Sequence, residues 1–213
     1  AVLIIYMIAG MLIFTNGVNT LSTLIYGSAA VIMGFLLYLL LSTLIFDLLN
    51  LFLKVPQKLQ GTLILISTIL ISTYGIWNAS QIKITERSVH LSGIDENIKA
   101  VHLSDIHLGH FRGKDYLQNL VLKTKEQDPD IVIISGDLFD GKIKLKKEVL
   151  QPLQEIQFPV FFVEGNHDIY SGVETIKSLV KSLGIIVLEN EIYEYKGMQI
   201  IGLNHMLADE NTY

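Results

Sequence analysis

Charge is distributed very unevenly along this chain of 213 residues. Residues 1–80 contain only three charged side chains, whereas residues 81–213 contain 14 Lys and Arg and 20 Asp and Glu. A segment this long with so few charges lacks the polar surface that a domain in water needs. The sequence therefore predicts two parts in different surroundings: a membrane region at residues 1–80 and a water-exposed domain at residues 81–213.

Three apolar segments occupy the first part. Residues 23–46 contain no charge, and residues 61–77 are also uncharged and end in aromatic residues of the kind that membrane interfaces favour. A spanning helix needs roughly 20 apolar residues. Residues 1–14 are apolar but fewer, and we expect them to be the tail of a span whose beginning is absent. The sequence therefore predicts about three transmembrane helices, the first of them truncated.

Two lysines indicate how these helices are oriented. The connection at residues 47–60 contains Lys54 and Lys58, whereas the connection at residues 15–22 is uncharged. Because Lys and Arg are enriched in cytoplasmic loops, residues 47–60 are predicted to face the cytoplasm. The last helix then leaves the cytoplasm. We expect an integral, multi-pass membrane protein whose domain at residues 81–213 is extracytoplasmic.

The second part alternates predicted strands with predicted helices. Residues 131–135 form a continuous apolar run, as in a strand that is covered on both faces. Residues 114–127 place apolar side chains on one helical face. This alternation predicts an α/β domain. Strands are predicted at residues 82–90, 99–104, 131–135, 159–164, 185–188, 192–195 and 198–203, with a turn at Lys196-Gly197, and helices at residues 114–127, 143–156 and 173–183.

Oxygen and imidazole side chains follow three of the predicted strands. Ligands of α/β sheets bind at the carboxyl ends of strands, so we expect these side chains to meet there. Each cluster alone also fits an ordinary turn or helix cap, but their order and their position after apolar strands favour a joint site. The side chains are Asp105 and His107, then Asp137 and Asp140, then Asn166, His167 and Asp168.

The chemistry of these side chains suits a pair of divalent metal ions. Carboxylate, amide and imidazole ligands favour Mn, Fe, Zn or a mixed pair, and the absence of cysteine excludes thiolate ligands. Two ions roughly 3.5–4 Å apart can stabilise the attacking and leaving oxygens of a displacement, with a hydroxide as the nucleophile. One carboxylate must bridge them. We expect Gly136 and Gly165 to let the backbone turn sharply beside the ions.

Three sequence patterns resemble the calcineurin-like metallophosphoesterase superfamily, in a membrane-anchored, bacterial-type form. They are Asp-x-His from residue 105, Gly-Asp-x-x-Asp from residue 136 and Gly-Asn-His-Asp from residue 165, within about residues 97–205. The resemblance implies a hydrolase that cleaves phosphate esters. It also implies a four-layer α/β/β/α sandwich, of which residues 81–213 would be the N-terminal part.

The resemblance implies a role for each site residue. Two metal ions would be held by Asp105 and His107 at the first position, Asn166 at the second and Asp137 as the bridge. The catalytic residues would be His167, as general acid or charge stabiliser near the phosphate, and Asp168, which would orient His167. Asp140 would support the site through hydrogen bonds.

The family's later ligands, an isolated His and a Gly-His-x-His pattern, have no counterpart here, since His205 is not followed by such a pair. We therefore expect the chain to be truncated at both ends, to bind metal weakly and to be inactive by itself. Phosphatase turnover by residues 1–213 alone would contradict that expectation.

The expected substrate is a phosphate monoester or diester, and a lipid-linked phosphate is a candidate because the helices would hold the domain near the bilayer. The acidic balance of residues 81–213 argues against a nucleic-acid partner. Arg112 could contact a phosphate or be an ordinary surface arginine. An alternative is a non-catalytic membrane scaffold or sensor with a degenerate phosphoesterase-like domain. A transport function is disfavoured because the first part has a single acidic residue, Asp47, at the end of a span.

Overall fold

The computed structural model describes residues 2–13, 18–94, 96–141 and 147–205. The chain divides into two compact units. The first comprises Ala1–Leu12 with Leu24–Glu86, and the second comprises Ile13–Thr23 with Arg87–Tyr213. The first unit is helical, and the second contains every strand of the described residues.

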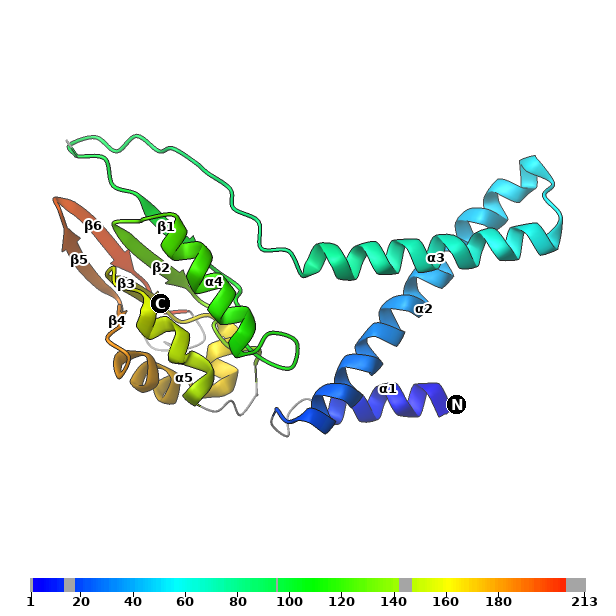
Figure 1. Cartoon of the computed structure of the whole chain (residues 1–213), viewed down its shortest axis with the longest axis horizontal. Coiled ribbons are helices and arrows are strands. Elements are labelled where there is room, and N and C mark those ends of the chain that lie inside the picture. Colours follow the sequence, from blue (N-terminus) through cyan, green and yellow to red (C-terminus); the bar gives the residue numbers. More distant parts are fainter. Residues whose placement is uncertain (1, 14–17, 95, 142–146, 206–213) are drawn as a thin grey trace. The chain divides into compact units, whose positions relative to one another are not determined.

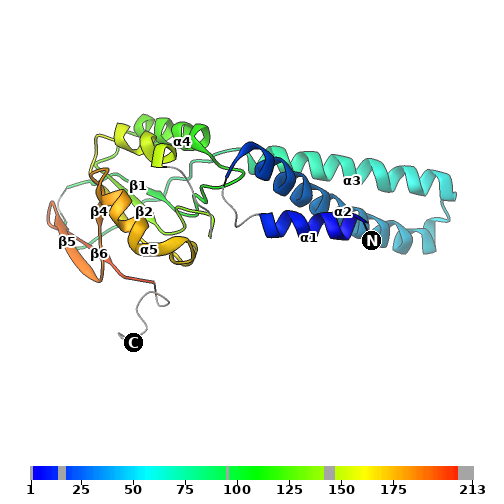
Figure 2. The same cartoon turned by 90° about the horizontal axis from the view of Figure 1, so that it is seen from below.

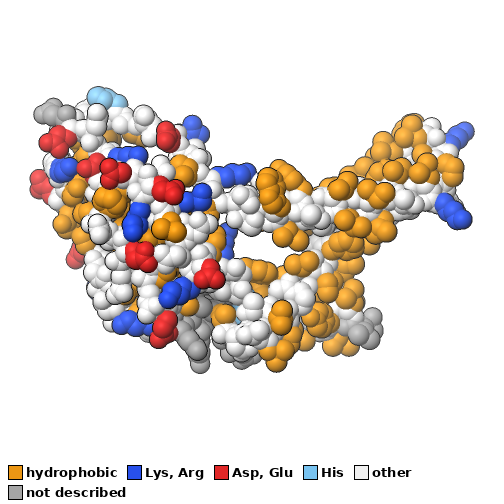
Figure 3. All heavy atoms as spheres, viewed as in Figure 1, with side chains coloured by type: hydrophobic (Ala, Val, Ile, Leu, Met, Phe, Trp, Pro, Cys, Tyr) orange, Lys and Arg blue, Asp and Glu red, His pale blue; other side chains and the backbone are white. Residues whose placement is uncertain are grey.

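Three helices form the first part of the chain: α1 (Val2–Ile13), α2 (Thr20–Leu53) and α3 (Gln57–Ala79). By length and composition, α2 and α3 could each cross a membrane, whereas the apolar stretch of α1 is shorter. Only 11% of the most apolar window of α2 and of α3 is buried, so their apolar side chains face outward rather than into a core. Figure 3 shows this apolar surface, with basic side chains gathered at the α2–α3 connection.

Small and polar side chains join these helices to one another. Gly10 of α1 lies so near α2 that a Cβ atom at this position would be 2.5 Å from the Cβ of Ala29. At the α2–α3 connection, Gln60 donates a hydrogen bond to Asp47 at 2.6 Å and accepts one from Asn50 at 2.8 Å. Close backbone approach and interhelical hydrogen bonds are the contacts that hold helices together in apolar surroundings.

The second unit is built on a parallel sheet in the order β1-β2-β3-β4 (Figure 1). Its strands are β1 (Ala100–Leu103), β2 (Ile131–Ser135), β3 (Val160–Val163) and β4 (Ile186–Val187). Leu103 pairs with Ile134, and Ser135 pairs with Val163. This register brings the carboxyl ends of β1, β2 and β3 to the same edge of the sheet.

Three helical segments connect the parallel strands: α4 (Lys114–Glu126), η2 (Lys147–Glu155), which is a 3-10 helix, and α5 (Asn166–Lys181). Crossovers between parallel strands are right-handed in nearly all proteins, so the sequential strand order places all three on one face of the sheet. Figure 2 shows α4 and α5 beside the strands in a second view. The other face of the sheet is left for a different layer.

That layer is an antiparallel hairpin of β5 (Glu191–Tyr195) and β6 (Met198–Gly202). Its turn residues, Lys196 and Gly197, have φ angles of 49° and 77°, so the predicted turn is confirmed. The hairpin buries Ile200 in one cluster with Ile131 and Phe161 of the sheet. Helices, parallel sheet and hairpin are successive layers, and the expected α/β domain is confirmed.

Most of the predicted elements are found within a few residues of their expected bounds, with three corrections. The strand predicted at residues 82–90 is wrong: these residues are irregular, and Ile84 and Val89 are 51% and 78% exposed. Their alternation has no partner strand, and a strand is stable only when paired. The helix predicted at residues 173–183 begins earlier, at Asn166, and is kinked at Gly172. The helix predicted at residues 143–156 is 3-10 helix in its described part; residues 143–146 lie outside the described residues.

Candidate metal centre

The loops after β1 and β2 are joined by backbone hydrogen bonds. His107 N donates to the carbonyl of Asp137 at 2.9 Å, and Leu108 N donates to the carbonyl of Leu138 at 2.9 Å. Asp140 N donates back to the carbonyl of Leu108 at 3.0 Å. These bonds continue the parallel pairing beyond the ends of the strands, so the first two clusters of site residues lie side by side.

The backbone of this site is strained at three predicted ligands. Asp105, His107 and Asp137 have φ angles of 54°, 49° and 52°. Residues other than glycine rarely adopt this left-handed region, which costs on the order of 1–3 kcal/mol per residue. Such conformations gather where a precise arrangement of side chains is held by the surrounding structure.

Gly136 and Gly165 allow the loops to approach each other, each for a different reason. Gly136 has a φ of 79°, which agrees with the sharp turn expected before Asp137. Gly165 has a φ of −108° and is extended, so the expected sharp turn is wrong there. A Cβ atom at Gly165 would instead lie 2.2 Å from Oδ1 and 2.5 Å from the backbone N of Asp137. Glycine is needed at this position because the Asp137 side chain lies against it.

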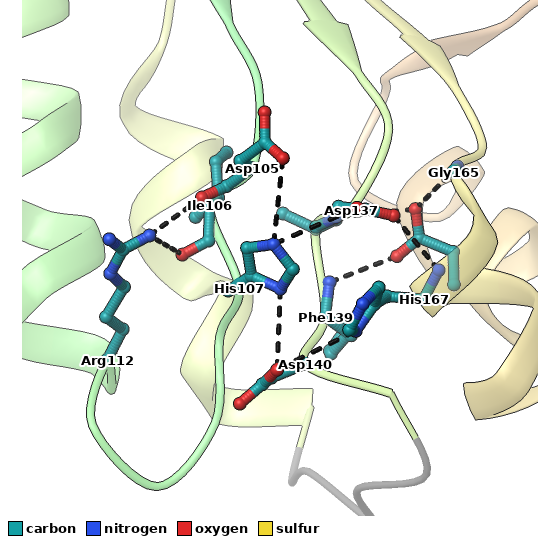
Figure 4. A network of polar contacts seen from close by, with 11 residues as sticks. Asp105, Ile106, His107, Arg112, Asp137, Phe139, Asp140, Gly165 and His167 are labelled. Carbon is teal, nitrogen blue, oxygen red and sulfur yellow. Dashed lines mark hydrogen bonds and ion pairs between the residues drawn. The ribbon is translucent and has the colours of Figure 1, made fainter. Parts of the chain in front are cut away.

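Two histidine rings and three carboxylates converge at this edge of the sheet (Figure 4). Nε2 of His107 lies 3.7 Å from Oδ1 of Asp105 and 3.8 Å from Oδ2 of Asp137. Oδ1 of Asp140 lies 3.4 Å from Nδ1 of His107 and 3.7 Å from Nδ1 of His167. The ring centres of the two histidines are 4.6 Å apart, edge to face.

This arrangement fits a bound cation. His107, Asp137 and His167 each offer a ligand atom, and these atoms lie within 4.8 Å of one another, so small movements would bring them to one ion. The buried Nδ1 atoms of both histidines have no hydrogen-bond partner among the described residues. Asp105 lies at the rim with its side chain 68% exposed. Asn166, the first residue of α5, is half-buried next to His167.

Asp168 is fully buried and holds two loops together. Its Oδ1 accepts a hydrogen bond from Phe139 N at 3.0 Å, and its Oδ2 accepts bonds from Gly165 N at 3.0 Å and Leu138 N at 3.3 Å. Burial raises the pKa of the Asp168 carboxyl above its ordinary value, and these three N–H groups oppose the rise. In this structure it is Asp140 whose carboxylate approaches the His167 ring.

The sequence did not predict a buried ion pair that lies beneath the site. The Glu164 side chain, at the end of β3, has no exposed surface and lies 3.6 Å from Nζ of Lys177, whose side chain is 6% exposed. Lys177 also contacts Glu189 at 2.8 Å. The only sign of this pair in the sequence is a charged residue, Glu164, between the apolar run of β3 and Gly165. This pair holds α5, and with it Asn166 and His167, against the sheet.

The arrangement can be compared with known proteins. The model of the calcineurin-like phosphoesterase family matches residues 98–206. An uncharacterized metallophosphoesterase of Helicobacter pylori is 33% identical over 128 residues, which are 59% of this chain and 35% of the relative. A protein of Danio rerio named as a transmembrane protein with metallophosphoesterase domain is 36% identical over 138 residues, 62% of this chain and 32% of the relative.

A protein of the same name from Bos taurus is 33% identical over 140 residues, again 62% of this chain and 32% of the relative. The chain therefore spans about a third of the length of these curated relatives. The family match includes all three clusters of site residues and covers half of the chain. By sequence, fold and site, the chain belongs to the calcineurin-like phosphoesterase family, a family of hydrolases.

Proposed function

We propose that this protein is a membrane-anchored, metal-dependent phosphoesterase. The observation that carries the proposal is the convergence of His107, Asp137 and His167 at the carboxyl edge of the parallel sheet, with buried ring nitrogens that have no hydrogen-bond partner among the described residues. Structural histidines normally bond both ring nitrogens when buried. Unpaired Nδ1 atoms leave both rings without a fixing hydrogen bond, and the imidazole and carboxylate groups gathered here are the ligand types that divalent cations take.

The ligands are proposed to serve two divalent ions of the Mn, Fe or Zn type. Asp105 and His107 would hold the first ion, Asn166 the second, and Asp137 would bridge them. When bound, such a pair supplies Lewis acidity and a water that is deprotonated near neutral pH. Asp137 suits the bridging role because its Oδ1 is already fixed by the backbone N–H of His167 at 3.0 Å, while Oδ2 faces His107.

His167 is proposed to donate the proton to the leaving oxygen of the ester. Its Nδ1 faces Asp140 at 3.7 Å, which leaves Nε2 for the transferred proton. The Asp140 carboxylate would orient the ring, because it is the carboxylate that faces Nδ1. Asp168 would act through the loops that it holds, because its carboxylate bonds to backbone groups on both sides of the site.

The membrane location is proposed from α2 and α3. Both are long and apolar enough to span a bilayer, and their apolar side chains are exposed. The relatives from Danio rerio and Bos taurus have "transmembrane" in their names. The domain is proposed to lie outside the cytoplasm, because Lys54 and Lys58 mark the α2–α3 connection as cytoplasmic. A phosphate mono- or diester that is linked to lipid is the proposed substrate, since a tethered domain works near the bilayer.

Hydrolysis of bis(p-nitrophenyl) phosphate by the intact protein in detergent, with added Mn²⁺, tests the activity. Asp137→Asn keeps the size of the side chain but removes the bridging charge, so we expect kcat/KM to fall at least 100-fold. The control is Asp115→Asn, an exposed carboxylate of α4, which should leave the rate unchanged. Equal rates for the wild type and Asp137→Asn would remove the proposal and favour a scaffold.

A further inference from the structure

The first loop of the site has an unusual backbone that its neighbours must hold in place. Asp105 and His107 are both left-handed, with φ angles of 54° and 49°, and Ile106 between them is 2% exposed. Strained residues of this kind persist only where the surrounding structure over-determines them. The His107 side of the loop is held by the bond from His107 N to the carbonyl of Asp137. A different contact must hold the backbone at Asp105.

Arg112 supplies that contact. One nitrogen of its guanidinium, Nη1, donates hydrogen bonds to the carbonyl oxygens of Asp105 at 2.7 Å and of Ile106 at 3.0 Å (Figure 4). These two oxygens belong to the consecutive peptide units that join Asp105 to His107. A single cationic donor therefore fixes both peptide planes between two predicted ligands. Bonds from a charged donor are about twice as strong as neutral ones.

Arg112 is itself held in position. Its guanidinium carbon lies 5.0 Å from the ring centre of Tyr116 on the first turn of α4. Its carbonyl accepts a hydrogen bond from Gly109 N at 2.8 Å, which closes the loop on itself. A planar guanidinium that is stacked on a ring loses little further freedom when it bonds. The Arg112 side chain is therefore held in its bonding position before any ligand binds.

We infer that Arg112 is a positioning residue that sets the geometry of Asp105 and His107 in the metal centre. The inference rests on the proposed function, since it concerns the same site. The described bonds of Arg112 go to main-chain oxygens rather than to the Asp105 carboxylate, so that carboxylate keeps its capacity for a metal ion. This differs from the sequence-based alternatives, a contact to phosphate or an ordinary surface arginine. The guanidinium instead donates hydrogen bonds to the protein's own backbone.

Cobalt binding to the intact protein in detergent tests this role, because the visible absorption of Co²⁺ reports both affinity and coordination geometry. Arg112→Met removes the donor, and we expect Co²⁺ to bind at least tenfold more weakly with a changed spectrum. Arg112→Lys keeps one charged nitrogen and should recover most of the affinity. The matched control is Arg87→Met, which removes the chain's other arginine, exposed in the irregular segment before β1, and should leave affinity and spectrum unchanged.

Each outcome decides between the roles. Co²⁺ affinity and spectrum within twofold of the wild type in Arg112→Met would overturn the inference. Loss of inorganic phosphate binding to the Co²⁺-loaded protein, with the Co²⁺ spectrum unchanged, would overturn it in favour of a substrate contact. If Arg112→Met does not fold, as judged by metal-free thermal unfolding, Arg112→Gln provides the same comparison with a neutral donor, and fivefold weaker Co²⁺ binding is expected. If the wild type binds no Co²⁺, the proposed function fails first, and the inference fails with it.

Discussion

The geometry of the candidate metal centre depends on the absence of a single carbon atom at Gly165. Asp137 occupies the space where a side chain at residue 165 would begin, and its Oδ1 accepts the His167 N–H in the same place. Gly113 gives a comparison, because it also precedes a helix in an extended conformation but has no atom within 4 Å of its missing Cβ. The two glycines thus differ in their surroundings rather than in their backbone.

Gly165→Ala should therefore disrupt the site without straining its own backbone. The new methyl group would overlap Asp137, so we expect at least tenfold weaker binding of Mn²⁺ and a loss of about 1–3 kcal/mol in the free energy of unfolding. Gly113→Ala weakens the N-cap of α4 in the same way as the change at Gly165, so it should cost only about 0.5–1 kcal/mol and leave Mn²⁺ binding intact. Calorimetric titration and thermal unfolding measure the two quantities. Equal Mn²⁺ affinity in both variants would show that Asp137 does not set the site.

At the scale of elements, a chain of charges joins β3, α5 and the segment after β4. Glu164 pairs with Lys177 at 3.6 Å, and Glu189 contacts both Lys177 and Lys181 at 2.8 Å. Burial alone lowers the pKa of Lys177, but its bonds to Glu189 and the charges of Glu164 and Glu174 outweigh burial, so the net pKa is raised. The ammonium therefore stays charged where it is buried.

Lys177→Met should destabilise the domain strongly, because it leaves the Glu164 carboxylate buried without a counter-charge. Breaking one side of a buried pair costs about 3–5 kcal/mol. Removing both charges, in Glu164→Gln with Lys177→Met, should restore at least half of the loss. Denaturant unfolding of the two variants measures this difference. A double variant as unstable as the single one would mean that packing, and not charge, decides the effect.

Acid should weaken the contact between α5 and the segment after β4. Hydrogen bonds from Lys177 and Lys181 lower the pKa of Glu189 below its ordinary value. A lowered carboxyl pKa adds stability that is present above pH about 4.5, the unfolded value, and is lost as the pH falls toward the folded value. Glu189→Gln should flatten this part of the pH profile of thermal unfolding. An unchanged slope below pH 5 would contradict the role of Glu189.

At the scale of the whole molecule, the surfaces of the two parts suit different surroundings. The exposed surface of α2 and α3 is apolar, which only a membrane or another apolar environment tolerates, whereas the α/β unit has charged side chains over its visible surface (Figure 3). The irregular segment at residues 81–94 connects the two. Under the proposed function, the side of the membrane on which the domain lies determines which phosphate esters it can reach.

Cysteine labelling can determine that side, because the chain has no cysteine of its own. We expect Asn119→Cys, exposed on α4, to react with a membrane-impermeant maleimide on intact cells. Gln57→Cys, exposed at the α2–α3 connection, keeps both lysines and should react only after lysis, since positively charged loops stay in the cytoplasm. The reverse pattern would place the domain in the cytoplasm. Labelling of both positions in detergent is the control for accessibility.

Local signals in the sequence were enough to predict the three apolar helices, α4, the four strands of the sheet and the hairpin, but not the start of α5 or the 3-10 type of η2. Apolar runs such as residues 131–135 define buried strands, and Lys196-Gly197 defines a turn, because both depend on neighbouring residues alone. The same runs predicted where the three clusters meet, since ligands of α/β sheets bind at the carboxyl ends of strands. The strand predicted at residues 82–90 failed because pairing depends on a distant partner, which alternation cannot reveal.

The sequence by itself determined the family, the fold class and the clusters that meet at one edge of the sheet, because strand ends and motif residues are adjacent along the chain. Only the tertiary structure showed that Gly165 makes room for Asp137, that Lys177 neutralises Glu164, and that Arg112 holds the backbone of Asp105. These contacts join residues on different elements. Their energies depend on distance and burial in three dimensions, which spacing along the chain does not encode.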